Sequence, residues 1–225
     1  MFVRIIQPIP LPRAENWTLL SLRLLLATLA WFFWPGITHA VGYGNEVSVW
    51  IEPGRAIAAS AASGRREIPL DVQETVASSE PSGINALVVT SRRLLGFSSH
   101  TLAWSELDRA LYEQVLDRRV FPTFSVVRTD KRLYGFRGAN GIWLDETLGI
   151  QETITMTRST DYGAVFVTNE RLVGFTSLLG DFSSKLLGIH EQITRLDIEQ
   201  GLIIVTTNKR LLIFGTRLSG WEEFE

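Results

Sequence analysis

The chain has 225 residues, of which 45% are apolar and 20% charged, enough to bury one or two ordinary hydrophobic cores. Its net charge of −2 argues against partners that are recognised by their negative charge, such as nucleic acids and anionic membrane surfaces. Cysteine is absent, which excludes disulfides, thiolate catalysis and cysteine-ligated metals.

The N-terminal segment has the pattern of a targeting sequence. Residues 24–34 form an apolar run that is preceded by three arginines and followed by Pro35-Gly36 and a small-x-small end at 38–40. Eleven residues fall short of the roughly 20 that a membrane span needs, whereas the longer stretch 17–40 reaches that length. We therefore predict a secretory signal or an N-terminal membrane anchor at 1–40, with a buried amphipathic helix as a third interpretation. Either leading interpretation places the rest of the chain outside the cytoplasm, in the periplasm or secreted.

The segment 41–66 is predicted to hold one strand and a linker. Residues 47–52 alternate between apolar and polar side chains, which is typical of a half-buried strand. Residues 53–66 are rich in Ala, Ser and Gly without alternation, which favours a loop or linker.

Residues 67–225 contain four copies of one repeat with a period of 39 residues. Five main columns run through the copies without insertion or deletion, and such self-similarity decides the architecture before any local pattern does. The columns are Glu74, Glu113, Glu152 and Glu191; Thr90, Thr129, Thr168 and Thr207; Arg93, Arg132, Arg171 and Arg210; Phe97, Phe136, Phe175 and Phe214; Trp104, Trp143, Phe182 and Trp221.

Each copy is predicted to form four short antiparallel strands. The Thr and Arg columns flank a tight hairpin turn, the Trp column falls in a third strand, and the residues after each Glu begin a fourth. A glycine before the phenylalanine in three copies indicates close backbone approach or a bulge. Trp50-x-Glu52 matches Trp104-x-Glu106 but lies one period plus 15 residues away, which suggests a partial fifth copy separated by an inserted linker.

Four strands per copy of about 40 residues resemble the blades of β-propeller repeat proteins, over residues 66–225. The Gly-His and Trp-Asp dipeptides of WD40 blades are missing, so the resemblance reaches the superfamily only. It implies an all-β fold, a small propeller of four or five blades that the Trp50 strand completes. The hairpin phrase also resembles that of bacterial PH-like domains, but those carry one such hairpin per domain. A closed β-barrel or an open stack of hairpins would also fit a repeat of this length.

The repeated columns favour structure over chemistry. Four glutamates could line a channel and bind a hard cation, but pairing of each Glu with an Arg of its own or the adjacent copy is the stronger interpretation, because buried charges are generally paired. The Trp column could offer stacking platforms for sugars, but large aromatics at one position of every blade are more often core.

Function is expected where the copies differ, in loops carried on a rigid scaffold. No nucleophile, phosphate-loop or metal motif appears, so we predict neither enzymatic activity nor a cofactor or metal. We expect an exported binding or assembly module for another envelope protein or membrane complex; the competing hypotheses are a glycan-binding lectin and a glycan-directed hydrolase. The candidate binding residues are His100, Arg118, Arg119, Arg137, Asn140, Asp161 and Tyr162.

Overall fold

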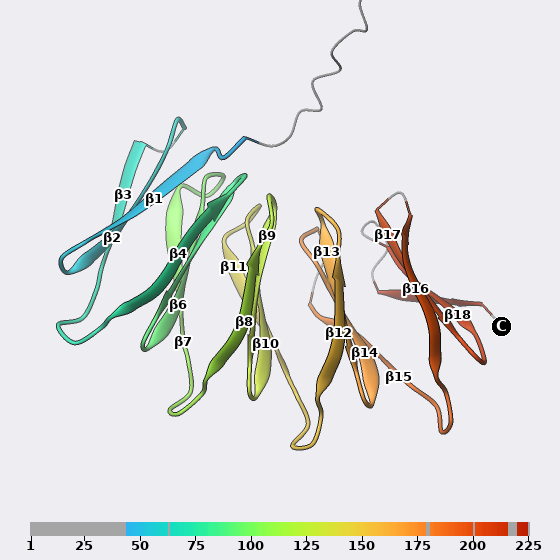
Figure 1. The fold of residues 1–225 in the computed structure, drawn as a ribbon. Coiled ribbons are helices and arrows are strands. Elements are labelled where there is room, and N and C mark those ends of the chain that lie inside the picture. The colour runs from blue at the N-terminus through green and yellow to red at the C-terminus, as the bar shows by residue number, and fades with distance from the viewer. Residues whose placement is uncertain (1–43, 63, 179–180, 200, 216–219, 225) are drawn as a thin grey trace, which may run out of the picture. The chain divides into compact units, whose positions relative to one another are not determined.

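The computed structural model describes residues 44–62, 64–178, 181–199, 201–215 and 220–224, and the prediction for 1–40 lies outside them. Only the unit 43–225 is described below. Its described residues are strands, turns and connecting segments, arranged as five antiparallel sheets (Figure 1). The all-β fold of four copies plus a partial N-terminal one is confirmed.

Each of the four copies forms one four-stranded sheet in which consecutive strands are neighbours. We call them the first to fourth repeat sheets. The first contains β4 (Val76–Ser82), β5 (Asn85–Thr90), β6 (Arg93–Ser98) and β7 (Ala103–Asp108); the second β8 (Val115–Val120), β9 (Phe124–Thr129), β10 (Arg132–Arg137) and β11 (Ile142–Thr147); the third β12 (Ile154–Ser159), β13 (Gly163–Thr168), β14 (Arg171–Thr176) and β15 (Ser183–Leu186); the fourth β16 (Ile193–Glu199), β17 (Leu202–Thr207), β18 (Leu211–Phe214) and β19 (Trp221–Phe224).

The structure corrects the expected linker at 53–66. An N-terminal sheet of three strands contains β1 (Val47–Glu52), β2 (Arg55–Ser60) and β3 (Gly64–Pro69). The predicted strand at 47–52 is therefore present, but the Ala-rich segment after it is a second strand and not a loop. There is also no insertion, because β3 begins 39 residues before β7. Trp50 lies outside the Trp column, and Arg65 pairs with Ala59 where Trp104 pairs with Phe97.

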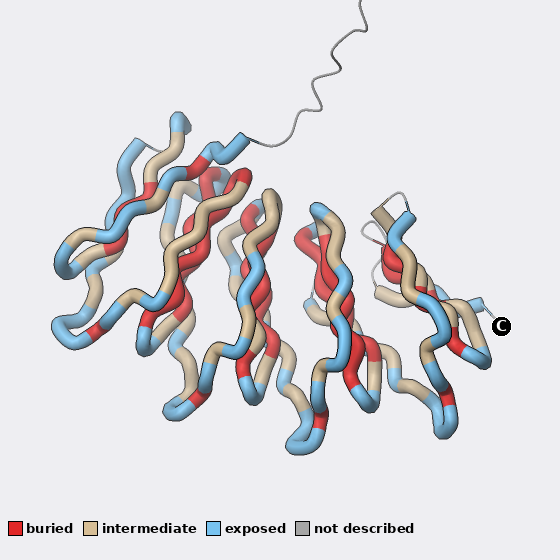
Figure 2. Tube along the Cα trace, viewed as in Figure 1, coloured by how far each residue is buried: buried red, intermediate tan, exposed pale blue. Residues whose placement is uncertain are grey.

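Successive sheets are held together by phenylalanines that fit against glycines. A Cβ added to Gly96 would lie 2.5 Å from the ring of Phe136 in the next sheet, and Gly135 and Gly174 receive Phe175 and Phe214 in the same way. The glycine column is therefore the close approach that the sequence indicated, since any side chain would occupy the volume of the ring. Figure 2 shows the resulting buried strands in the middle of each sheet.

The tryptophans hold neighbouring sheets together from the last strand of each sheet. Trp143 packs against Phe136 with ring centroids 5.0 Å apart, and its Nε1 donates to the carbonyl oxygen of Ser105 in the preceding sheet at 3.2 Å. Trp104 and Trp221 make the same bond to Arg66 and Ser183. The third copy has Phe182 here, which keeps the ring contact but has no N–H to donate.

An even number of strands in each repeat sheet brings all connections between sheets to one end. The crossover loops at 70–75, 109–114, 148–153 and 187–192 lie there together with the β-hairpin turns that follow β5, β9, β13 and β17 (Figure 1). We call this the crossover end. The remaining turns within the four repeat sheets lie at the opposite end.

Candidate functional site

In three of the copies, the carboxylate of the repeated glutamate accepts hydrogen bonds from the repeated arginine of the same copy. Glu191 accepts from Arg210 Nε at 2.7 Å, from Thr207 Oγ1 at 2.9 Å and from the backbone N–H of Gly188 at 2.7 Å. The bonds from Arg210 lower the pKa of Glu191 to about 2. Glu74 and Glu152 are buried, which alone would raise the pKa, but hydrogen bonds from Arg93 and Arg171 reverse the effect and lower it. Both oxygens of each of these carboxylates already accept hydrogen bonds from the protein, which favours pairing over cation binding.

The same arginines connect one sheet to the one before it. Arg93 Nη2 donates to the carbonyl oxygen of Pro69 at 2.7 Å, and Arg210 does so to Leu186 at 2.7 Å. Arg171 contacts Thr147 in the same way at 2.8 Å. The Glu and Arg columns thus lie side by side, as expected for pairing, and their geometry is that of sheet-to-sheet packing.

The second copy departs from this network. Glu113 accepts from the hydroxyl of Tyr134 at 2.9 Å in place of an arginine, and Arg132 contacts Asp145 at 3.4 Å instead. Burial of Tyr134, together with its bond to Glu113, raises the pKa of its hydroxyl. The reason lies in the sequence, because position 134 is a tyrosine where the other copies have Leu95, Val173 and Leu212.

A second departure in the same copy is Arg109, which stands where the other copies have Leu70, Leu148 and Leu187. Its guanidinium donates to the backbone carbonyls of Glu113 and Thr90, both at 2.7 Å. Its Nε is buried without a hydrogen-bond partner among the described residues. A charged side chain has therefore replaced an apolar one at the junction of the first and second repeat sheets.

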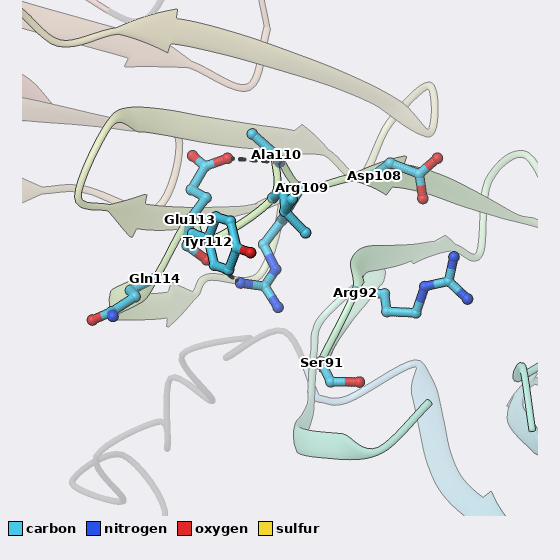
Figure 3. A pocket seen from close by; sticks show the side chains of 9 residues that line it. Ser91, Arg92, Asp108, Arg109, Ala110, Tyr112, Glu113 and Gln114 are labelled. Carbon is cyan, nitrogen blue, oxygen red and sulfur yellow. Dashed lines mark hydrogen bonds between the residues drawn. The ribbon is translucent and has the colours of Figure 1, made fainter. Parts of the chain in front are cut away.

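Arg109 lies beside an open pocket of about 430 Å³ at the crossover end (Figure 3). The pocket is lined by two guanidinium groups, two carboxylates and a phenol but by no imidazole or thiol, so it is suited to binding polar groups. Its lining residues are Ser91, Arg92, Asp108, Arg109, Ala110, Leu111, Tyr112, Glu113 and Gln114.

The candidate residues from the sequence lie mostly at the opposite end or on the edge strands, and they are not gathered in one place. Arg118 pairs with Glu80 of the preceding sheet at 2.7 Å, and Arg137 donates to the carbonyl oxygen of Ser177 in the next sheet at 3.2 Å. These two basic side chains are thus engaged in contacts between sheets.

The other candidates are distributed as follows. Arg119 pairs with Asp117 on its own strand at 3.4 Å, and His100 is exposed in the β6–β7 turn. Asn140 lies in the β10–β11 turn. Asp161 and Tyr162 are brought together beside a pocket of about 420 Å³, which also contacts Ile198 and Gly201.

The outer surfaces of the two terminal sheets differ sharply in polarity. On the N-terminal sheet, Ala56 and Ala58 face the first repeat sheet, so the alternate residues face away from it. On that outward side Ile57 is fully buried. Arg55 and Arg65 both pair with Glu67 there at 2.8 Å, and Arg55 also pairs with Glu52. Trp50, which pairs with Ile57, lies on the same side and is partly exposed, so this surface combines paired charges with one aromatic ring.

The outward side of the fourth repeat sheet is apolar. Val205 and Leu212 pack against the third repeat sheet, and the alternate residues therefore point the other way. We call this outward side the C-terminal face; Ile213 stands on it where the earlier copies have the glycine that receives a phenylalanine. Its apolar residues are Leu202, Ile204, Leu211, Ile213 and Phe224.

Sequence reasoning missed these features although part of the signal was present. Alignment of the four copies would have singled out Arg109, Tyr134 and Ile213 as departures from their columns. The charged outer side of the N-terminal sheet could not be found, because a linker at 53–66 would have no outer side.

Within the described residues, no three His, Asp or Glu side chains are placed so that they could hold a metal ion. None of the described segments is a helix of the length and apolar character needed to cross a membrane.

No protein-family model matches the chain, and no curated protein matches it. Solved structures that align with parts of the chain include YCF48 bound to D1 peptide, at 11% identity and a TM-score of 0.33, covering 81% of this chain and 64% of that one. PorZ of Porphyromonas gingivalis, a surface component of the type-IX secretion system, is 9% identical with a TM-score of 0.38 and coverages of 80% and 26%. A chain in the structure of Kap60 bound to yeast RCC1 (Prp20) is 6% identical with a TM-score of 0.40 and coverages of 76% and 54%. The chain thus spans less than two thirds of each of these proteins.

Proposed function

We propose that the protein is a non-catalytic binding and assembly module, which packs against a partner protein through its C-terminal face. The observation that carries this proposal is the difference between the two terminal sheets. The terminal units of a repeat array need a polar outer surface if the array is to remain soluble on its own. The N-terminal sheet has charged side chains on its outer surface. The C-terminal face has aliphatic side chains at the same place, and no further sheet covers it within the described chain.

The C-terminal face has the chemistry of an interface core. The two central strands contribute Leu202, Ile204, Leu211 and Ile213, while Asp197 and Glu222 lie on the flanking strands. An apolar centre with charged residues at the margin is the arrangement of specific protein interfaces. In each of the earlier sheets the equivalent surface is covered by the next sheet, so a flat apolar protein surface is the partner that fits.

The export predicted from residues 1–40 would place this partner outside the cytoplasm, in the envelope or in a membrane complex. Glycan binding and hydrolysis stay predictions without a supporting site. The three tryptophan rings that a lectin could have used as sugar platforms are tilted against phenylalanines, and their N–H groups bond to the neighbouring sheet.

The proposal can be tested with a photo-cross-linking aromatic residue in the full-length chain, in its native cell. Position Phe224 is 49% exposed on the C-terminal face, and Trp50 is 40% exposed on the charged N-terminal sheet, which makes it a matched control. We expect a defined protein adduct at 224 and not at 50. The adduct should disappear in Ile204→Asp, and thermal unfolding should show that this variant still folds. Equal adducts at both positions, or no protein adduct at 224, would contradict the proposal.

A further inference from the structure

Each crossover loop presents one branched aliphatic side chain to solvent at its tip. The four tip residues are 39 apart and are among the most exposed apolar residues in the described chain. They are Val72 (105% relative exposure), Leu111 (76%), Ile150 (106%) and Ile189 (82%).

The fold gives no reason for aliphatic residues at the tips. In the third copy, the N–H of Gly149, just before the tip, donates to the side chain of Glu152, two residues after the tip. The side chain of Ile150 between them is fully exposed, so the loop conformation does not depend on its packing. Valine and isoleucine are poor turn residues, for which Gly, Asn, Asp and Ser are favoured. Single exposed aliphatic residues are ordinary, but the same exposed position in all four copies indicates a shared contact.

The spacing of the tips decides between the two kinds of surface that could bind them. Packed sheets lie about 10 Å apart, so neighbouring tips recur at about that interval and stand as separate apolar points. Protein interfaces place their binding energy in a contiguous, fully buried core, which separate points do not provide. A fluid lipid interface can accept each point independently, as it accepts the apolar side of an amphipathic segment.

The N-terminal run leaves room for this placement. The described domain begins at the end opposite the crossover end, where the N–H of Glu46 donates to the carbonyl oxygen of Gly83 in the β4–β5 turn at 2.9 Å. Residues 35–43 join the apolar run at 24–34 to that end and reach at most about 30 Å when extended, more than the roughly 20 Å length of a six-residue strand. A run anchored in a bilayer therefore does not prevent the crossover end from contacting the same lipid surface, and two membrane contacts give firmer attachment than one.

We propose that the crossover end lies against a lipid bilayer, with Val72, Leu111, Ile150 and Ile189 inserted into its interfacial layer. The hairpin turns beside the tips carry Arg92, Lys131, Glu170 and Lys209. Asp71 pairs with Arg92, and Asp130 lies next to Lys131. Opposite charges are thus nearly balanced at this end. Apolar insertion should therefore dominate, with little dependence on salt or on anionic lipid.

The absence of cysteine makes a direct test simple. Full-length Ile150→Cys and Ile189→Cys would be labelled with an environment-sensitive fluorophore and mixed with phosphatidylcholine vesicles, with or without phosphatidylglycerol. His100→Cys, exposed at the opposite end, is the matched control. We expect a blue shift and quenching by lipid-borne spin labels at positions 150 and 189, in both lipid mixtures, and neither at position 100.

A second variant separates the tips from the N-terminal run. A label at Leu111→Cys should lose its blue shift when Ile150→Asp and Ile189→Asp are added, because burial of each isoleucine changes partitioning roughly 10-fold or more. Vesicle flotation without any shift at 111, 150 and 189 would assign attachment to residues 17–40 alone and overturn the proposal. Failure of the full-length chain to bind vesicles would overturn it too. Neither result bears on the protein adduct at Phe224, so this inference and the proposed function can fail separately.

Discussion

Substitution of Gly96 by alanine tests the contact that joins one sheet to the next. The added Cβ would lie 2.5 Å from Cδ2 and Cε2 of Phe136, whereas carbon atoms in contact are ordinarily 3.5–4.0 Å apart. The ring therefore has to move by about 1 Å or the sheets must separate. Phe136 is fully buried and packs against Trp143 at 5.0 Å, so it has little free space into which to move.

Overpacking of this kind costs about 1–3 kcal/mol. Replacement of glycine by alanine also lowers the entropy of the unfolded chain, which offsets about 0.4–1 kcal/mol. We therefore expect Gly96→Ala to lower the free energy of unfolding by about 1–2 kcal/mol, measured by urea unfolding followed by tryptophan fluorescence.

Gly149→Ala is the matched control, because its added Cβ would lie 3.4 Å from the nearest atom and the second copy already has Ala110 at the equivalent position. It should change the unfolding free energy by less than about 0.5 kcal/mol. Phe136→Leu makes room for the new methyl group, so the double variant Gly96→Ala/Phe136→Leu should be more stable than the sum of the two single changes predicts. Equal effects of Gly96→Ala and Gly149→Ala, or strict additivity with Phe136→Leu, would refute the reasoning.

Three further variants test the networks between the sheets. The pKa of Glu191 is lowered from 4.5 to about 2, so its stabilisation is complete above pH 4.5 and is lost as the pH falls toward 2. Glu191→Gln should remove up to about 3 kcal/mol at neutral pH and flatten acid unfolding in that window, and an unchanged acid limb would contradict this. Phe182→Trp supplies the N–H that the third copy lacks and should add about 1 kcal/mol if it reaches the carbonyl of Leu144, detected as a higher urea midpoint. Tyr134→Phe removes a donor from the buried carboxylate of Glu113 and should cost about 1–3 kcal/mol, whereas an effect below about 0.5 kcal/mol would show that another donor replaces it.

Much of the architecture could be predicted from the sequence, because each local pattern recurs in four copies and each copy supports the same assignment. The Thr-to-Arg hairpin, the strand after each Glu and the close approach at each glycine appear where the periodic columns placed them. The prediction of a linker at 53–66 was wrong for a physical reason. Its alanines are small because Ala58 receives Phe97 of the next sheet, so a composition typical of loops came from tight packing.

Local sequence determined the period, the strands and the pairing partners within one copy, since these depend on neighbours along the chain. Only the tertiary structure decided which surfaces stay open. Leu202 and Leu172 are alike as residues, but the third repeat sheet is covered by the fourth, and the outward side of the fourth has no sheet on it within the described chain. Ile150 could equally have been core. Its exposure follows from its place at the tip of a loop, which is a property of how the sheets are stacked and not of the residue itself.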